Sequence, residues 1–240
     1  MTETAKKELA PNGRLRAALN YSNFLLVSAR SPEHAGVAPD LARELARRAG
    51  AAVEFVGYDN AGLVADAAGQ EVWDIAFIGA EPARARDITF TPAYVEIDAT
   101  YLVPADSTIR GIEEIDREGV RIATAARAAY TLFLRRTLRH ATLVEAHGIQ
   151  ASFDRFVESR LDGLAGLRPR LQEDAARLPG ARLLGGRFTA VKQSIAVPRS
   201  HVAAATYLKA FVAEIGSSGF LRESIDRHRA CGLSIVGGAP

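Results

Sequence analysis

Apolar residues in the first part of the chain follow two spacings in turn. Leu15, Ala17 and Leu19 alternate with other positions, which predicts a strand, whereas Leu41 and Leu45 lie four residues apart, as on one face of a helix. Two further strands and one short helix are expected here, at residues 51–59 and 72–79 for the strands and 60–69 for the helix. Strand and helix in alternation is typical of an α/β fold with a parallel sheet.

A second block of alternating elements is expected after Pro104. Its predicted strands and helices occupy residues 111–125, 128–141, 142–148, 149–160, 161–167 and 168–180, and two helices at 201–216 and 220–230 end the chain. Two long extended segments, near 94–103 and 188–197, separate the blocks. The pattern therefore predicts two lobes, residues 1–100 plus 188–240 and residues 101–187, with two hinge crossovers and a ligand cleft.

The composition excludes several classes of function. The chain has 240 residues, 48% hydrophobic and 24% charged, which is an ordinary balance for globular proteins. The 30 basic residues are interspersed with 28 acidic ones, so no nucleic-acid partner is predicted. The single cysteine, Cys231, excludes an intrachain disulfide, and the five scattered histidines have no metal-ligand spacing. We therefore expect no metal and no cofactor.

The chain contains no apolar run of the length that a signal peptide or a membrane span requires. As written, the sequence predicts a cytoplasmic protein that does not insert into the membrane. A periplasmic location is expected instead if a leader was removed. We expect a monomer or a weak dimer.

Polar residues gather where the predicted strands end. Ligand sites in open α/β sheets lie beyond the carboxyl ends of the strands. In this chain those ends read "NYSNF", "GAEPAR", "TAARAAY" and "AGLRPR". The second of these places Glu81, Arg84 and Arg86 directly after an apolar strand, so we expect a binding site here.

Several segments, taken in order, resemble one family. They are "YSNFLL", "GVAPDLARELARRAG", "WDIAFIGAEPARARDITFTPAY", "AAYTLFL", "RLDGLAG" and "SSGFLRESIDRH". From about residue 13 to 230 the chain resembles the type 2 solute-binding proteins, in particular those that bind polar amino acids for ABC importers. The resemblance implies the two-lobed α/β fold of the periplasmic binding proteins.

The resemblance also implies roles for residues of the first lobe. Arg84 matches the arginine that holds the carboxylate of the ligand, a role that suits a guanidinium because it donates two parallel hydrogen bonds. The alternative is a surface arginine paired with Glu81. Tyr21 and Phe24 match an aromatic wall and Asn23 could add an amide contact, although Phe24 could equally pack in the core.

The sequence departs from the family at four places. Glu81 and Gly79 replace hydroxyl residues, and Arg127 with Ala128 replaces a hydroxyl-rich helix start. Leu167, followed by Arg168, stands where the family has an aspartate for the α-ammonium group. Either the ligand is an organic anion held by arginines, or its ammonium group contacts Glu81 or, less plausibly, Asp162.

Three functions from different classes fit these residues. The first is the non-enzymatic binding of a small carboxylated solute, an amino acid or organic acid, as the binding component of an ABC importer or as a leaderless relative. The second is a dehydratase-like enzyme with Glu81 as its acid or base, because some relatives of this fold are dehydratases. The third is a cytoplasmic ligand sensor.

Overall fold

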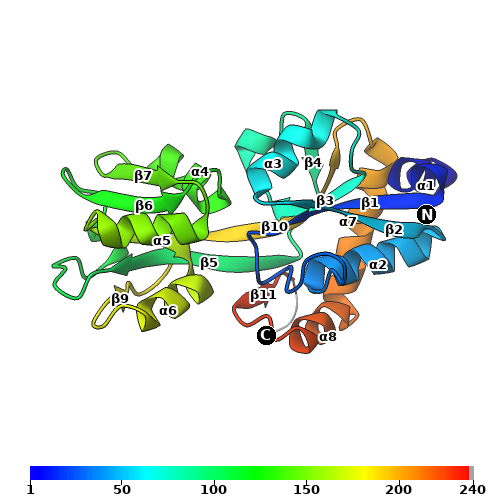
Figure 1. Cartoon of the computed structure of the whole chain (residues 1–240). Coiled ribbons are helices and arrows are strands. Elements are labelled where there is room, and N and C mark those ends of the chain that lie inside the picture. The colour runs from blue at the N-terminus through cyan, green and yellow to red at the C-terminus, as the bar shows by residue number, and fades with distance from the viewer. Residues whose placement is uncertain (238–240) are drawn as a thin grey trace. The chain divides into compact units, whose positions relative to one another are not determined.

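The computed structural model describes residues 1–237. The chain packs into two compact units (Figure 1). Unit 1 consists of residues 1–96 and 192–240, and unit 2 consists of residues 97–191. Each unit has its own sheet, its own helices and its own buried core, so each is described separately below.

The sheet of unit 1 has the strand order β2-β1-β3-β10. The strands are β1 (Arg14–Asn20), β2 (Ala52–Tyr58), β3 (Ile75–Gly79) and β10 (Thr189–Pro198). β1 runs parallel to both β2 and β3, whereas β10 runs antiparallel to β3. β4 (Ile88–Phe90) pairs with the C-terminal end of β10. The short strand β11 (Leu233–Ile235) is followed by Val236, whose N–H donates to the Tyr94 carbonyl at 3.1 Å.

Helices cover both faces of this sheet. α2 (Val37–Ala49), α7 (Val202–Ser217) and α8 (Phe220–Arg227) contribute to the cluster on one face, and α3 (Ala61–Asp66) contributes to the cluster on the other. α1 (Glu3–Leu9) packs beside α7, and the Glu8 carboxylate accepts the Ala204 N–H of α7 at 2.7 Å. Glu8 therefore binds one of the amides that the start of α7 leaves without a helical partner.

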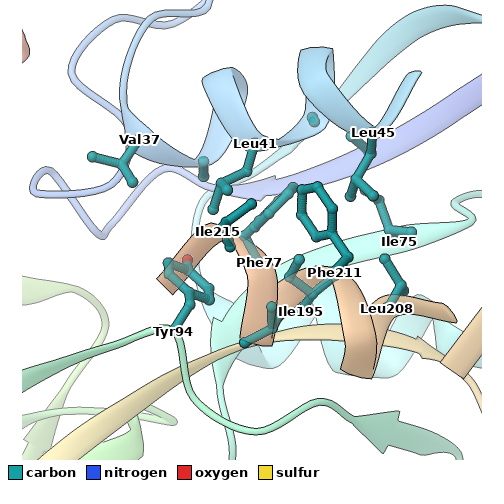
Figure 2. Close-up of a cluster of buried hydrophobic side chains, with 14 of the residues drawn as sticks. Val37, Leu41, Leu45, Ile75, Phe77, Tyr94, Ile195, Leu208, Phe211 and Ile215 are labelled. Carbon is teal, nitrogen blue, oxygen red and sulfur yellow. The ribbon is translucent and has the colours of Figure 1, made fainter. Parts of the chain in front are cut away.

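The largest cluster of unit 1 lies between β1, β3, β10 and the helices α2 and α7 (Figure 2). Leu41 and Leu45, predicted to share one face of a helix, are 0% and 1% exposed. Burying a leucine side chain contributes about 2 kcal/mol. α2 ends at Gly50, whose φ of 61° is left-handed, a conformation that glycine adopts without strain.

Unit 2 repeats the alternation with a sheet in the order β5-β8-β6-β7. Its strands are β5 (Val95–Val103), β6 (Arg121–Ala125), β7 (Thr142–Ala146), β8 (Gly163–Leu167) and the short β9 (Arg182–Leu183), which pairs with β5. The helix α4 (Ala129–Thr137) packs on one face of the sheet. The helices α5 (Ile149–Glu158) and α6 (Arg168–Ala176) pack on the other.

The predicted helices and strands are present, but the parallel sheet is only part of the arrangement. The strands joined through helices are parallel in both units, as β1 with β2 and β6 with β7. The two long extended segments run the other way, because β10 is antiparallel to β3 and β5 is antiparallel to β8. The parallel pairing predicted for the alternating blocks is therefore confirmed, and the two crossover segments add antiparallel strands. None of the helices in residues 1–237 has the length and apolar character to cross a membrane.

Candidate functional site

The candidate residues of unit 1 lie at the edge where β1 and β3 end. β10 begins its pairing with β3 at this edge, with Gln193 opposite Gly79 and Ala80 N donating to the Lys192 carbonyl at 2.8 Å. Beyond Gly79 the chain makes a 3₁₀ turn at Pro82–Arg84, in which Arg84 N donates to the Glu81 carbonyl at 2.9 Å. The carboxyl edge of the sheet therefore carries Gly79, Glu81 and Arg84 as a group.

Arg84 is buried, with 6% of its surface exposed. Its Nη1 donates to the Gly79 carbonyl at 2.6 Å, so the guanidinium is held against the end of its own strand. This burial rules out the alternative of a surface arginine. Arg86, two residues later, is a surface arginine: its side chain is 88% exposed and pairs with Asp87 at 2.9 Å.

Tyr21 is held against β2. Its hydroxyl lies 3.0 Å from His34 Nε2, and the Arg30 guanidinium lies 4.9 Å from the centre of its ring. A Cβ atom at position 57 would lie 2.2 Å from the Tyr21 ring, so only Gly57 permits this approach. Phe24, the second predicted aromatic, is half-buried.

Asn23 is 5% exposed, and its side-chain oxygen has no hydrogen-bond partner within residues 1–237. Three further oxygens near this edge share that property, those of Tyr94, Gln193 and Ser194. Sequence analysis did not single out these three residues. The available signal was the polar pair Gln193 and Ser194 inside the otherwise apolar run of β10.

In unit 2, Arg127 and Ala128 connect β6 to α4 at the carboxyl edge of the sheet. Arg127 is half-buried and has a φ of 64°, a left-handed conformation that is uncommon outside glycine. Ala128 is the N-cap residue of α4 and has no side-chain oxygen to cap the helix. The start of α4 therefore has the positive end of a helix dipole and a guanidinium beside it, which together favour an anion.

Arg168 begins α6 at the same edge. Its Nη2 donates to the Gly186 carbonyl, and its Nε lies 3.8 Å from an oxygen of Asp98, which Arg187 also contacts at 2.8 Å. Leu167, where the family has an aspartate, is 6% exposed and ends β8. Two arginines thus share one carboxylate at this side of unit 2.

A second ion-pair network in unit 2 connects α5 and α6. Arg170 Nε lies 3.1 Å from both oxygens of Asp174, which is 1% exposed, and Arg170 Nη2 donates to Gln150 at 2.8 Å. Since Gln150 is in α5 and Arg170 in α6, the network joins the starts of two helices. Tyr130 of α4 lines a small cavity with Arg170 and Asp174, and burial raises the pKa of its hydroxyl.

Asp162 lies at the opposite edge of the unit 2 sheet. It precedes β8, and its carboxylate accepts the Arg121 N–H at 2.7 Å where β6 begins. The suggestion that Asp162 could contact an ammonium group beside Arg127 and Arg168 was therefore wrong. Residues 1–237 contain no group of three or more His, Cys, Asp or Glu side chains that could hold a metal ion.

Solved structures match the fold over nearly the whole chain. A mutant of ArgBP from T. maritima is 18% identical, with a TM-score of 0.76 and coverage of 94% of this chain and 99% of that one. The cysteine-binding protein from Campylobacter jejuni is 16% identical, with a TM-score of 0.77 and coverage of 99% and 100%. An ancestral amino acid-binding protein, described as a precursor of cyclohexadienyl dehydratase, is 18% identical, with a TM-score of 0.76 and coverage of 92% and 97%. The predicted α/β fold of the periplasmic binding proteins is confirmed.

Sequence comparison identifies the family. No curated protein matches the chain by sequence. The family model for bacterial extracellular solute-binding proteins, family 3, matches residues 16–229, which include nearly all of both units. The resemblance found in the motifs is confirmed, and the chain belongs to the bacterial extracellular solute-binding proteins of family 3.

Proposed function

We propose that this chain binds a small carboxylated solute as the binding component of an ABC importer. Membership of the solute-binding family supports the binding role. Solved structures of the same fold include an arginine-bound ArgBP, a cysteine-binding protein and an ABC transporter component complexed with lysine. All three ligands have a carboxylate, which is the group that the arginines of this chain would recognise.

The observation that carries this proposal is the burial of Arg84 at the carboxyl edge of unit 1. A buried guanidinium is costly unless its charge is compensated, so it is seldom kept without a role. Its hydrogen bond to the Gly79 carbonyl fixes the plane of the guanidinium. A guanidinium of fixed orientation favours a carboxylate because both oxygens can accept at once.

Unit 2 has arginines of its own at the carboxyl edge of its sheet. Arg127 lies beside the start of α4, and Arg168 lies at the start of α6. Leu167 supplies no carboxylate where the family has one for an ammonium group. This arrangement supports an anionic group of the ligand as the main feature that unit 2 recognises.

A thermal-shift screen tests the proposal. The panel comprises amino acids, dicarboxylates and aromatic acids, with calorimetric titration of every compound that stabilises the protein. A true ligand binds once per chain and raises the melting temperature progressively with its concentration. If no carboxylate of the panel binds, the proposed function is wrong.

Arg84→Lys is the informative variant, because it keeps the charge and loses the planar pair of donors. Losing one of two parallel hydrogen bonds to a charged group costs about 1.5–3 kcal/mol, so we expect affinity to fall about 10- to 150-fold. Arg86→Lys is the matched control, since Arg86 is exposed two residues away, and it should bind as wild type does. Equal affinity in wild type and Arg84→Lys would contradict the assignment of the site.

One alternative function is an enzyme of the dehydratase kind. Its support is the likeness in fold to the ancestral protein described as a precursor of cyclohexadienyl dehydratase, together with the half-buried Glu81 beside Arg84. A carboxyl group at that position could transfer a proton to or from a bound carboxylate. Turnover of a cyclic carboxylate that is lost in Glu81→Gln, with binding retained, would favour the enzyme. Binding without turnover in both proteins would favour the importer component.

A further inference from the structure

Unit 1 buries four side-chain oxygens that have no hydrogen-bond partner within residues 1–237. They belong to Asn23, Tyr94, Gln193 and Ser194, each at most 5% exposed. Buried polar atoms are hydrogen-bonded in the great majority of cases, so each exception needs an explanation. Two of the four, Asn23 and Gln193, have amide oxygens near the carboxyl ends of β1 and β3.

The strand register assigns Gln193 and Ser194 to opposite faces of the sheet. Gln193 lies opposite Gly79, on the same side as Phe77 and Ile195. Ser194 lies opposite Ile78, on the other side. Ile195 and Phe77 belong to the cluster beneath α2 and α7, whereas Ile78 belongs to the cluster beneath α3.

Asn23 is in the loop that follows β1. The loop that contains it contributes Leu26 and Val27 to the cluster beneath α2, and the Asn23 carbonyl accepts from the backbone amides of both residues. The Tyr94 backbone amide donates to the Gln193 carbonyl at 2.9 Å. Asn23 follows β1 and Gln193 lies opposite Gly79, so the two amide oxygens without a donor belong to residues near the carboxyl edge of this sheet.

We propose that Gln193, together with Asn23, accepts a hydrogen bond from an N–H or O–H group of the ligand, so that the site selects carboxylates that also carry a donor. This inference rests on the proposed function. Gln193 is placed for it because it lies opposite Gly79, whose carbonyl holds the Arg84 guanidinium. The ligand carboxylate at Arg84 and the ligand donor at Gln193 would then lie on neighbouring strands.

An amide oxygen that is already shielded from water suits this role. Binding removes little further water from it, so the new hydrogen bond adds to affinity with little opposing desolvation. The terminal torsion of glutamine is broad, so the carboxamide can rotate to present its oxygen. The ammonium group of an amino acid is the simplest donor, and its acceptors would then come from unit 1 and not from an aspartate in unit 2.

Gln193→Leu tests the inference, with Ser194→Ala as the matched control on the other face of the same strand. Both variants remove a buried oxygen that has no partner, so both should raise the melting temperature of the ligand-free protein by a few degrees. The probes are two pairs of compounds that differ in the ammonium group: L-glutamate with glutarate, and L-phenylalanine with 3-phenylpropanoate. Calorimetric titration gives the affinity of each protein for each compound.

In wild type and Ser194→Ala we expect at least one amino acid to bind roughly tenfold or more tightly than its deaminated partner. In Gln193→Leu that preference should vanish while the deaminated partner still binds. Equal affinities within both pairs in wild type, an unchanged preference in Gln193→Leu, or an equal loss in Ser194→Ala would each overturn the inference. Those results leave carboxylate binding intact, whereas a wild-type protein that binds no carboxylate of either pair or of the wider panel refutes the proposed function.

Discussion

Replacing Tyr94 by phenylalanine should stabilise the protein, although it removes a polar group from the buried core of unit 1. Tyr94 is 1% exposed and lies in the cluster with Leu41 and Phe211, and its ring meets Phe77 edge to face at 6.4 Å between centroids (Figure 2). Its hydroxyl has no partner within residues 1–237. The substitution keeps the ring and removes only this oxygen.

The expected gain follows from the cost of an unpaired buried hydroxyl. Protein data place that cost at about 1–3 kcal/mol. The void left by the missing oxygen offsets a small part of this gain, so we expect the free energy of unfolding to rise by about 1–2 kcal/mol. For a protein of this size each kcal/mol raises the melting temperature by about 2–4 °C. Differential scanning calorimetry of the ligand-free protein resolves such a shift.

Tyr130→Phe provides the opposite case. Tyr130 is also buried, at 4% exposure, but its hydroxyl has a hydrogen bond with the backbone of Ala125. Removing that hydroxyl should destabilise unit 2 by about 0.5–1.5 kcal/mol. A decrease in stability for Tyr94→Phe as large as that for Tyr130→Phe would refute the reasoning, because it would mean that the Tyr94 hydroxyl contributes a favourable contact.

Alkaline pH should enlarge the difference in stability between wild type and Tyr94→Phe. Burial raises the pKa of Tyr94 above its usual value near 10. A group whose folded pKa is raised contributes stability that is fully present below the unfolded pKa and is lost as pH rises above it. Wild type should therefore lose stability above about pH 10 more steeply than Tyr94→Phe does, by up to roughly 1.4 kcal/mol per pH unit. Parallel curves for the two proteins would contradict this.

Two further predictions concern packing and acid stability. Gly57→Ala should displace the Tyr21 ring and lower the free energy of unfolding by roughly 1–3 kcal/mol. In a Tyr21→Ala background the same change should cost almost nothing. A double-mutant cycle by urea unfolding measures this difference. The pKa of Glu44 is lowered to about 2 by its hydrogen bonds with Arg47 and Arg48, so its contribution is present above the unfolded value near 4.5 and is lost as pH falls toward 2. In acid unfolding, the free energy of unfolding of Glu44→Gln should therefore depend less on pH between those values than that of wild type. An unchanged pH dependence would show that the bonds of Glu44 with Arg47 and Arg48 contribute nothing.

The sequence predicted the helices and strands well where local pattern determines them. α2 is an example, because its apolar spacing, Pro39 and Gly50 all indicate the same element. α1 was not predicted, since its sequence is mostly charged and its burial depends on α7, which lies almost two hundred residues later. The direction of β10 was also inaccessible, because an apolar strand has the same pattern whether it pairs parallel or antiparallel.

The site was predictable as a set of positions and less so as a set of orientations. The strand ends made Arg84, Asn23 and Arg127 candidates without any coordinates, and their roles in binding stay predictions. That Arg84 is buried and bound to Gly79 depends on how the 3₁₀ turn folds back, which no spacing reveals. Gln193 was overlooked because strand patterns draw attention to apolar residues, and a buried polar residue looks like an ordinary interruption.

The division of unit 1 into two separate stretches of sequence has a consequence for its synthesis. Unit 2 is one continuous segment, so it can fold as soon as residue 191 has left the ribosome. Unit 1 cannot complete its fold at that time, because β10 supplies the second partner of β3, and α7 supplies Leu208 and Phe211 to its core. Residues 1–96 therefore keep apolar surface exposed until the segment that begins at residue 192 has emerged. Unit 1 therefore completes its fold after unit 2, and a chain that stops before residue 192 would have a folded unit 2 and an incomplete, aggregation-prone unit 1.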